Sequence, residues 1–259
     1  MAEVKAKKYL GQHFLKDKNV ARRIVESLPI QEKTSVLEIG PGMGILTQFL
    51  INQPLIDLVA IEIDHESVIY LHKHFPNLKV IEGDFLQLDL QKIFSGEFYI
   101  IGNFPYNISS QIFFKLLENK DIIPSLTGMV QKEVAERLAA LPGSKIYGIL
   151  SVLLQAYYKV EYLFTVDENV FQPPPKVKSA VIQLTRNENL NIGCNEKLFK
   201  TVVKTAFNQR RKTLRNSLEP LIEKNHEIYK NSFFDKRPEQ LDVTAFIQLT
   251  NQIEKAMKQ

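Results

Sequence analysis

The chain contains one cysteine and no long apolar run, and each shortage excludes a class of protein. Cys194 has no second cysteine to bond with, so an internal disulfide is impossible and we expect a cytoplasmic protein in a reducing compartment. No run reaches the ~18 apolar residues that span a bilayer. The basic N-terminus also lacks the apolar core of a secretory signal. We therefore expect neither export nor a membrane partner.

Metal ligands and nucleophiles are scarce as well. His65, His72 and His74 follow one another at i, i+7 and i+9, which is not the spacing of a metal-binding pair on a helix. Cys194 lies in a polar stretch, far along the chain from the motifs described below. We expect no metal, and a reaction without a covalent enzyme intermediate.

Positive charge is concentrated in two blocks. The net charge of the 259 residues is only +4, but residues 1–23 carry seven lysines and arginines against two acids. Residues 196–215 carry seven against one. Nucleic acid is the natural polyanionic partner of such blocks, and two ordinary solvated faces are the alternative.

Short runs rich in Ile and Val alternate with helical patterns over most of the chain. Two strands near the end of this region, 160–166 and 179–185, have no helix between them. The layout predicts an α/β protein with a mostly parallel seven-stranded sheet and one antiparallel strand, the Rossmann-like arrangement of methyltransferases rather than of dehydrogenases. The other predicted strands are 35–40, 58–64, 78–84, 98–103 and 126–131, and the predicted helices include 45–52, 109–120, 131–141 and 147–158.

The domain division follows from a change in composition. Residues 186–196 are polar and without a pattern, and beyond them apolar residues recur at helical spacing. We predict a Rossmann-like domain over residues 1–185, including a basic N-terminal arm, and a small all-helical domain over residues 190–259.

A glycine-rich turn follows the first of these strands. Gly40, Gly42 and Gly44 remove Cβ atoms where a ligand must approach the backbone. Ile45 stands where a dinucleotide fingerprint has its third glycine, and Glu38 would be unfavourable beside a pyrophosphate. A positively charged sulfonium ligand meets no such objection. The turn therefore predicts a site for the methionine part of S-adenosyl-L-methionine, with a nucleotide-dependent oxidoreductase as an alternative.

Carboxylates end the next two strands. Glu62 can accept hydrogen bonds from both hydroxyls of a ribose, and Asp84 can accept one from the amino group of a cofactor adenine. A helix cap or a solvated strand end is the alternative role of either residue taken singly. The glycine turn and both carboxylates together predict a cofactor site.

The tetrapeptide Asn103-Phe104-Pro105-Tyr106 ends the next strand and indicates the chemistry. An adenine N6 amine attacks poorly because its lone pair is delocalised into the ring. The Asn103 side-chain carbonyl and the Phe104 main-chain carbonyl could each accept an N6 hydrogen, Pro105 stiffens the turn, and Tyr106 offers a stacking face worth ~1–3 kcal/mol. We predict direct methyl transfer governed by orientation and fixed dipoles. An Asx-type turn that merely closes a strand is the alternative.

The second basic block falls on a predicted amphipathic helix. Its apolar side is formed by Phe199, Val202, Val203 and Ala206. Its cations would contact phosphates without reading sequence, and an ordinary solvated helix is the alternative. These cations are Lys200, Lys204 and Lys212 on one row, Arg211 and Arg215 on the next, and the adjacent Arg210.

These motifs resemble the KsgA family of ribosomal RNA adenine dimethyltransferases nearly from end to end. The tetrapeptide is shared with the resistance methylases of large-subunit rRNA, whereas the run FNQRRKTLRNSL and the triple proline are similar to the KsgA family specifically. The segments that carry the resemblance are 11–17, 37–47, 61–64, 83–84, 102–112, 131–138, 171–181 and 207–218.

The resemblance implies a substrate and a set of site residues. It implies dimethylation, with S-adenosyl-L-methionine, of N6 of two adjacent adenosines near the 3′ end of small-subunit (16S) rRNA, late in assembly of the 30S subunit and by a monomer. The helical domain would face the RNA. His13 stands where the family often has asparagine, and imidazole still offers one donor and one acceptor. By match of motif, the cofactor-contacting residues are His13, Leu15, Gly40, Glu62, Asp84 and Asn103, and Tyr106 and Phe171 lie around the target base.

Two further alternatives stay open at this point. One is an adenine N6-methyltransferase of large-subunit rRNA, of the resistance type. The other is a ribosome-assembly binding factor whose catalysis is dispensable. The intact Asn103, Pro105 and Tyr106 argue against loss of chemistry.

Overall fold

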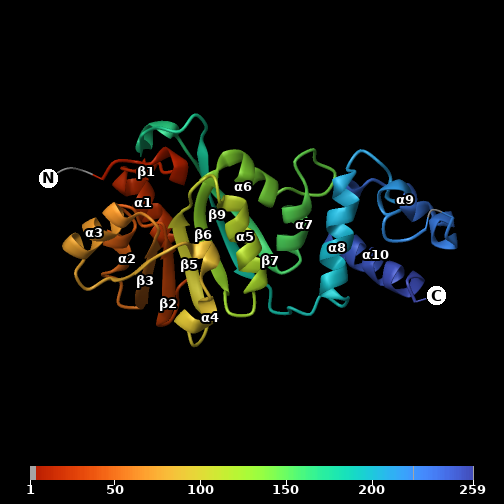
Figure 1. The fold of residues 1–259 in the computed structure, drawn as a ribbon, viewed down its shortest axis with the longest axis horizontal. Coiled ribbons are helices and arrows are strands. Elements are labelled where there is room, and N and C mark those ends of the chain that lie inside the picture. Colours follow the sequence, from red (N-terminus) through yellow and green to blue (C-terminus); the bar gives the residue numbers. More distant parts are fainter. Residues whose placement is uncertain (1–3, 224, 259) are drawn as a thin grey trace. The chain divides into compact units, whose positions relative to one another are not determined.

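The computed structural model describes residues 4–223 and 225–258. They form two compact units (Figure 1): residues up to 135 with 160–186 make the first, and residues 136–159 with those from 187 onward make the second. The break near residue 186 is where the sequence predicts it. Residues 136–159, however, belong to the second unit, where the helix Ile149–Gln155 contacts the helices Glu196–Asn208 and Val243–Ala256.

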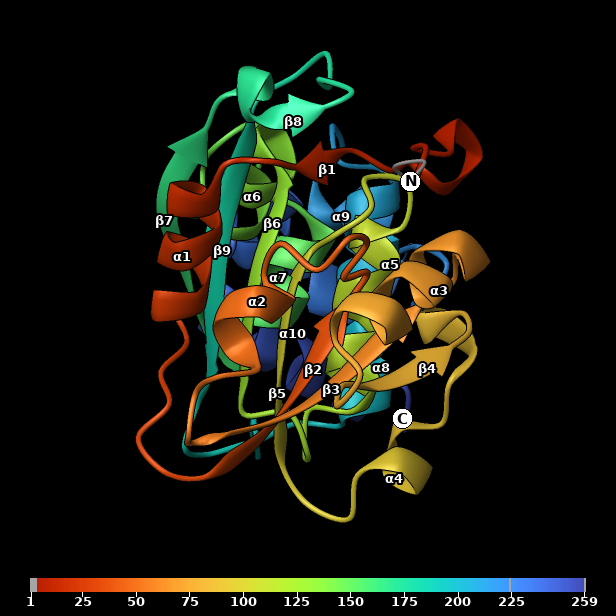
Figure 2. The ribbon, with the colours of Figure 1, turned by 90° about the vertical axis from the view of Figure 1, so that its left-hand side faces the viewer.

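The first unit is built on a seven-stranded sheet in the order β4-β3-β2-β5-β6-β9-β7 (Figure 2). From β4 to β6 the neighbouring strands are parallel, and β9 runs antiparallel to β6. The predicted sheet is confirmed, with small shifts at the strand ends. Its strands are β2 (Thr34–Ile39), β3 (Ile56–Glu62), β4 (Lys79–Glu82), β5 (Phe98–Asn103), β6 (Ser125–Gln131), β7 (Tyr158–Val166) and β9 (Ser179–Arg186).

Helices cover the sheet because its central strands are apolar on both faces. On one face, α1 (Lys18–Glu26) begins at Asp17, whose carboxylate accepts the backbone N–H of Asn19 and Val20, and it buries Ala21, Ile24 and Val25. These residues share a hydrophobic cluster with residues of β2, β3, α2 and α3. The other helices that begin in this unit are α2 (Thr47–Leu50), α3 (His65–His74), α4 (Leu90–Ile93), α5 (Ser109–Glu118) and α6 (Lys132–Leu138).

A short two-stranded sheet, which the sequence did not indicate, connects the N-terminal arm to the proline-rich loop. β1 (Phe14–Leu15) pairs antiparallel with β8 (Phe171–Gln172), so that Leu15 lies opposite Phe171. Two residues make too short a run for any periodicity to appear. The pairing joins segments that are more than 150 positions apart in the sequence, as the register Phe14 to Gln172 shows.

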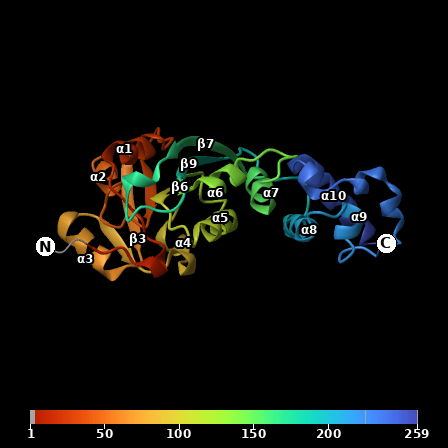
Figure 3. The same cartoon turned by 90° about the horizontal axis from the view of Figure 1, so that it is seen from above.

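The second unit is helical. α7 (Ile149–Gln155), α8 (Glu196–Asn208) and α10 (Val243–Ala256) lie side by side (Figures 1 and 3), and α9 (Leu214–Ser217) and short 3₁₀ turns complete it. Phe207 of α8 joins the packing, with its ring centroid 5.8 Å from that of Phe246 and 6.2 Å from that of Tyr147. The four apolar residues predicted for the buried side of α8 are all buried. The helix ends at Asn208, so the predicted cation row that continues to Lys212 is wrong.

Candidate active site

A cavity opens at the carboxyl ends of β2, β3 and β5, where parallel strands of one sheet bring distant residues together. Most of the predicted site residues lie on its wall: His13, Gly40, Gly42, Glu62, Asp84, Asn103, Phe104, Pro105 and Tyr106. Further lining residues that the sequence analysis did not single out are Gln12, Ile63, Leu86 and Ile108. The one sequence signal for Ile63 was its place directly after the strand-ending Glu62, and in the structure its side chain is 50% exposed.

The structure requires glycine at each of these positions of the turn for a different reason. Gly40 and Gly42 have φ of 64° and 56°, a left-handed backbone that disfavours side chains. A Cβ on Gly42 would lie 2.8 Å from the Phe14 ring. Gly44 (φ 80°) lines neither this cavity nor a smaller one beside it, and a Cβ there would lie 2.3 Å from the Phe75 ring. The missing side chain of Gly44 therefore makes room for Phe75, and contact of Gly44 with the cofactor stays a prediction.

Glu62 is buried in the wall of the cavity and joins two loops. Its Oε2 accepts the backbone N–H of Gly42 at 3.0 Å, and its Oε1 accepts that of Asp64 at 2.9 Å. Burial raises the pKa of Glu62, and the backbone hydrogen bonds oppose that rise. Each carboxylate oxygen retains a lone pair for a ligand hydroxyl.

Asp84 both lines the cavity and caps a 3₁₀ turn over residues 85–87. Its Oδ1 accepts the backbone N–H of Leu86 at 2.9 Å, so the helix-cap alternative is realised as well. Lys115 of α5 braces the same turn, donating from Nζ to the carbonyls of Leu86 at 2.9 Å and Leu88 at 2.5 Å. Lys115 could not be predicted from the sequence, because its partners are backbone carbonyls that only folding brings near it.

Glu38 and Leu15 line the smaller adjoining cavity rather than the main one. Glu38 is 1% exposed, and burial raises its pKa to about 7. Thr47 Oγ1 donates to its Oε2 at 2.7 Å, while Oε1 has no partner among the described residues. An unpartnered acceptor at the end of β2 fits a ligand that carries positive charge.

The tetrapeptide after β5 is held rigidly. Asn103 donates from Nδ2 to the His13 carbonyl at 3.0 Å, which leaves its Oδ1 as an acceptor. The Phe104 ring is 1% exposed and occupies space that only Gly128 and Gly102 leave open. The Tyr106 hydroxyl bonds Ser179 Oγ at 2.5 Å. Backbone and ring are thus fixed before any ligand arrives, as a preorganised site requires.

His13 joins the arm to the proline-rich loop. Its Nδ1 lies 2.8 Å from the Pro173 carbonyl, and its ring centroid lies 5.2 Å from that of Tyr106. Because a carbonyl only accepts, Nδ1 carries the proton of this hydrogen bond. A neutral His13 therefore presents Nε2 as an acceptor.

Phe171 is not where the resemblance places it. Its ring is 1% exposed, belongs to the hydrophobic cluster under the sheet and lines neither cavity. A buried ring has no free face for a base, so the prediction that Phe171 stacks on the target is wrong for this structure. The β1–β8 pairing explains the difference, since it directs this side chain into the core.

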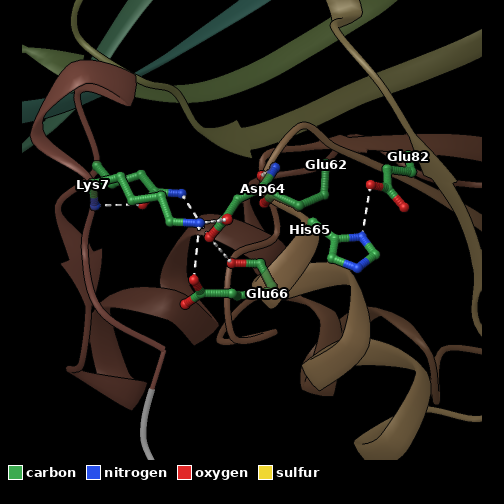
Figure 4. A network of polar contacts seen from close by, with 8 residues as sticks. Lys7, Glu62, Asp64, His65, Glu66 and Glu82 are labelled. Atoms are coloured by element: carbon green, nitrogen blue, oxygen red, sulfur yellow. Dashed lines mark hydrogen bonds and ion pairs between the residues drawn. The ribbon is translucent and has the colours of Figure 1, made fainter.

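The N-terminal arm is fastened to the loop after β3 (Figure 4). Lys7 Nζ forms an ion pair with Asp64 and lies 3.3 Å from Glu66 Oε1. Gln12 accepts the Lys7 backbone N–H at 2.8 Å and donates to Asp64 Oδ2 at 3.5 Å. Burial raises the pKa of Asp64, but hydrogen bonds from Lys7, Ser67 and Gln12 outweigh it and hold the pKa below its ordinary value. The sequence analysis counted Lys7 only as part of the basic N-terminal block and did not predict these contacts.

The basic residues of the second unit have separate surroundings. Arg210 donates to the Ser144 carbonyl at 3.1 Å, and Arg215 forms an ion pair with Asp235 at 2.5 Å. Arg211 and Lys212 lie exposed in the turn after α8, while Lys200 and Lys204 lie on α8. They do not form the single helical face that the sequence predicts, and their contact with RNA stays a prediction.

Two features are absent from residues 4–223 and 225–258. None of the helices there is long and apolar enough to cross a membrane. No group of three or more His, Cys, Asp or Glu side chains there could hold a metal ion.

Comparison with known proteins identifies the family. A model described as ribosomal RNA adenine dimethylase matches residues 3–255. Proteins named ribosomal RNA small subunit methyltransferase A are similar over the full length. The one from Parabacteroides distasonis is 64% identical over 96% of this chain and 94% of its own. The one from Bacteroides thetaiotaomicron is 61% identical over 100% and 97%.

Solved structures agree with this. A dimethyladenosine transferase from Plasmodium falciparum superposes with a TM-score of 0.80 at 28% identity, over 94% of this chain and 98% of that one. The 23S rRNA methyltransferase ErmE superposes with a TM-score of 0.69 at 26% identity, over 93% and 99%. The oxidoreductase alternative is excluded. The protein, as its motifs predict, is a member of the ribosomal RNA adenine dimethylase family.

Proposed function

We propose that the protein uses S-adenosyl-L-methionine to dimethylate N6 of two adjacent adenosines near the 3′ end of 16S rRNA, late in assembly of the 30S subunit. The relatives at 57–64% identity are named small-subunit methyltransferases, whereas ErmE, a 23S rRNA enzyme, is 26% identical. The observation that carries the chemistry is the Asn103 amide. Its Nδ2 is occupied by the His13 carbonyl, so Oδ1 can accept an N6 hydrogen at the cavity wall.

The cavity wall suits each part of the proposed cofactor. Glu62 would accept the ribose hydroxyls and Asp84 the adenine amino group, against the apolar Ile63, Leu86 and Ile108. The unpartnered Oε1 of Glu38 fits the positive charge of the methionine end. When bound, S-adenosyl-L-methionine supplies an electrophilic methyl group on a sulfonium.

The chain's own residues then orient the attacking amine. Asn103 Oδ1 and the Phe104 main-chain carbonyl accept the two N6 hydrogens and direct the nitrogen lone pair toward the methyl carbon. Tyr106, held by Ser179, provides a stacking face for the base. N6 would accept the methyl group that the cofactor supplies, and one N6 proton would leave to solvent. Fixed dipoles and orientation supply the rate.

We propose that cations of the second unit contact the RNA. Arg211 and Lys212 are exposed in the turn after α8, and cations of this kind position a nucleic acid through its phosphates. Lys200, Lys204, Arg210 and Arg215 are the further predicted contacts. We expect the protein to act as a monomer in the cytoplasm, where ribosomal subunits assemble.

Tritiated S-adenosyl-L-methionine tests the proposal directly. The protein is incubated with small ribosomal subunits from cells that lack it, and the label is located by nuclease digestion and nucleoside chromatography. Label in N6,N6-dimethyladenosine near the 3′ end of 16S rRNA is the expected result. Label in large-subunit RNA alone would favour the resistance-type methylase. No label in either, with cofactor binding intact, would favour an assembly factor whose catalysis is dispensable.

A further inference from the structure

A second cavity of ≈ 450 Å³ in the first unit shares His13 and Tyr106 with the cofactor cavity. Its volume lies within the range of ~300–1,000 Å³ that small-molecule sites occupy. Its remaining wall includes Lys8, Gln131 and the segment 173–177. Because Tyr106 lines both cavities, a base stacked on its ring can occupy the second cavity and face the cofactor at the same time.

Gln131 is placed there by the sheet. It is the last residue of β6 and lies opposite Ser179 in the antiparallel pair with β9, so both side chains are on the same face. Ser179 in turn bonds the Tyr106 hydroxyl at 2.5 Å. The next residue is also fixed, since the Lys132 backbone N–H donates to the Lys178 carbonyl at 2.9 Å. Gln131 and Ser179 are thus fixed on neighbouring strands, and the Ser179 hydroxyl connects them to Tyr106 in the turn after β5.

The Gln131 amide is available to a ligand. Within residues 4–223 and 225–258 its side chain has no hydrogen-bond partner, although it is partly buried and lines the cavity. A glutamine amide is one of the groups that pair with adenine edges. The N6 hydrogens are already assigned to Asn103 and Phe104, so the free Gln131 donor suits a ring nitrogen, which only accepts.

The rest of the wall fits a nucleotide embedded in RNA. Val177 is an apolar side chain left 44% exposed, which suits contact with the face of a base. Lys8 and Lys176 are exposed cations on the same wall, which suits phosphates on either side of the base.

We propose that this cavity receives the target adenine and that Gln131 donates a hydrogen bond from Nε2 to N1 or N7, the two ring nitrogens nearest the N6 amine, making Gln131 a specificity-determining residue. The inference rests on the proposed adenine methylation. A bond to N1 would select against guanine, which carries a hydrogen on N1. A bond to N7 would select purines over pyrimidines only, because guanine shares the N7 acceptor.

The test combines a variant with altered substrates. Gln131→Leu keeps the size of the side chain and removes its donor, and Gln111→Leu, at an exposed position of α5, is the matched control. Small subunits are reconstituted with adenosine, 1-deazaadenosine or 7-deazaadenosine at the target position. Single-turnover methylation and cofactor affinity are measured for each protein.

We expect Gln131→Leu to lower the methylation rate on natural subunits about tenfold, with cofactor affinity unchanged. The methylation rate of the wild-type protein should fall by a similar factor on one of the deaza substrates. The rate of Gln131→Leu on that substrate should equal its rate on natural subunits. The role of Gln131 would be overturned if the wild-type protein kept full activity on both deaza substrates. It would also be overturned if the deaza substitution slowed Gln131→Leu by the same factor as wild type. Either result would leave the proposed function standing. Failure of the wild-type protein on natural subunits would instead overturn the proposed function and this inference with it.

Discussion

Lys7 forms an ion pair with Asp64, 57 residues further along the chain, and so holds the N-terminal arm against the loop that follows Glu62. The Asp64 side chain is fully buried, and its backbone N–H donates to Glu62 Oε1. The arm residues Gln12 and His13 form part of the cofactor cavity wall. The Lys7–Asp64 ion pair therefore couples the position of the N-terminal arm to that of Glu62, the carboxylate proposed to bind the ribose.

Removing the lysine charge should loosen the arm. We expect Lys7→Met to weaken binding of S-adenosyl-L-methionine several-fold while leaving the sheet folded, because a buried carboxylate then lacks its cation. Isothermal titration calorimetry measures the affinity, and Lys5→Met, an exposed lysine of the same arm, is the control. High salt should change the difference in affinity between wild type and Lys7→Met only slightly, because an ion pair with a buried partner is screened much less than an exposed one. Equal affinities at low salt would refute the coupling.

Glu38 should make cofactor affinity depend on pH. Burial raises its pKa to about 7, so in the free protein much of it is protonated below that pH, and a cationic ligand favours the ionised form. We expect affinity to rise between pH 6 and pH 8, with proton release on binding near pH 6.5. Glu38→Gln should flatten this profile, as calorimetry in two buffers of different ionisation enthalpy would reveal.

The Glu38 carboxyl should also make the free energy of unfolding decrease as the pH rises, whereas cofactor affinity increases. Its folded pKa lies above its ordinary value of 4.5, so the folded state holds its proton more firmly. The stabilisation is complete below pH 4.5 and is lost as the pH rises through 7. Chemical denaturation of Glu38→Gln should show a smaller decline over this interval. An identical decline in both proteins would assign the pH dependence to other groups.

Gly44 should matter for stability rather than for cofactor binding. Gly44→Ala places a Cβ 2.3 Å from the Phe75 ring at a φ of 80°, and we expect it to cost about 1–3 kcal/mol. In a double-mutant cycle, Phe75→Ala should relieve part of that cost, because the opposing ring is removed. Denaturant unfolding measures all four proteins. Additive losses would show that the ring is not the obstacle.

Asn103 should govern the chemical step. We expect Asn103→Ala to lower the single-turnover methylation rate by about 10²–10³-fold, the loss typical of one preorganised polar group. Its effect on cofactor affinity should be far smaller, because Glu62 and Asp84 remain. Asn52→Ala, at an exposed position after α2, is the control. A loss confined to cofactor affinity would remove Asn103 from the transfer step.

The sequence by itself determined the local features of this protein. Apolar runs bounded by turns predicted all seven strands of the large sheet, since a strand buried on both faces needs only a short apolar segment. The turn at residues 40–44, the carboxylates Glu62 and Asp84, and residues 103–106 were predicted together, because strand ends of one parallel sheet converge. These properties depend on residues close to one another in the chain.

Only the tertiary structure decided which distant groups meet. It paired β1 with β8, buried Phe171, set Phe75 against Gly44 and joined Lys7 to Asp64. It also packed residues 136–159 with the second unit. The sequence shows which face of a helix or strand is apolar and which side chains are charged. The partner of that face or charge is set by the packing of segments that the sequence keeps far apart.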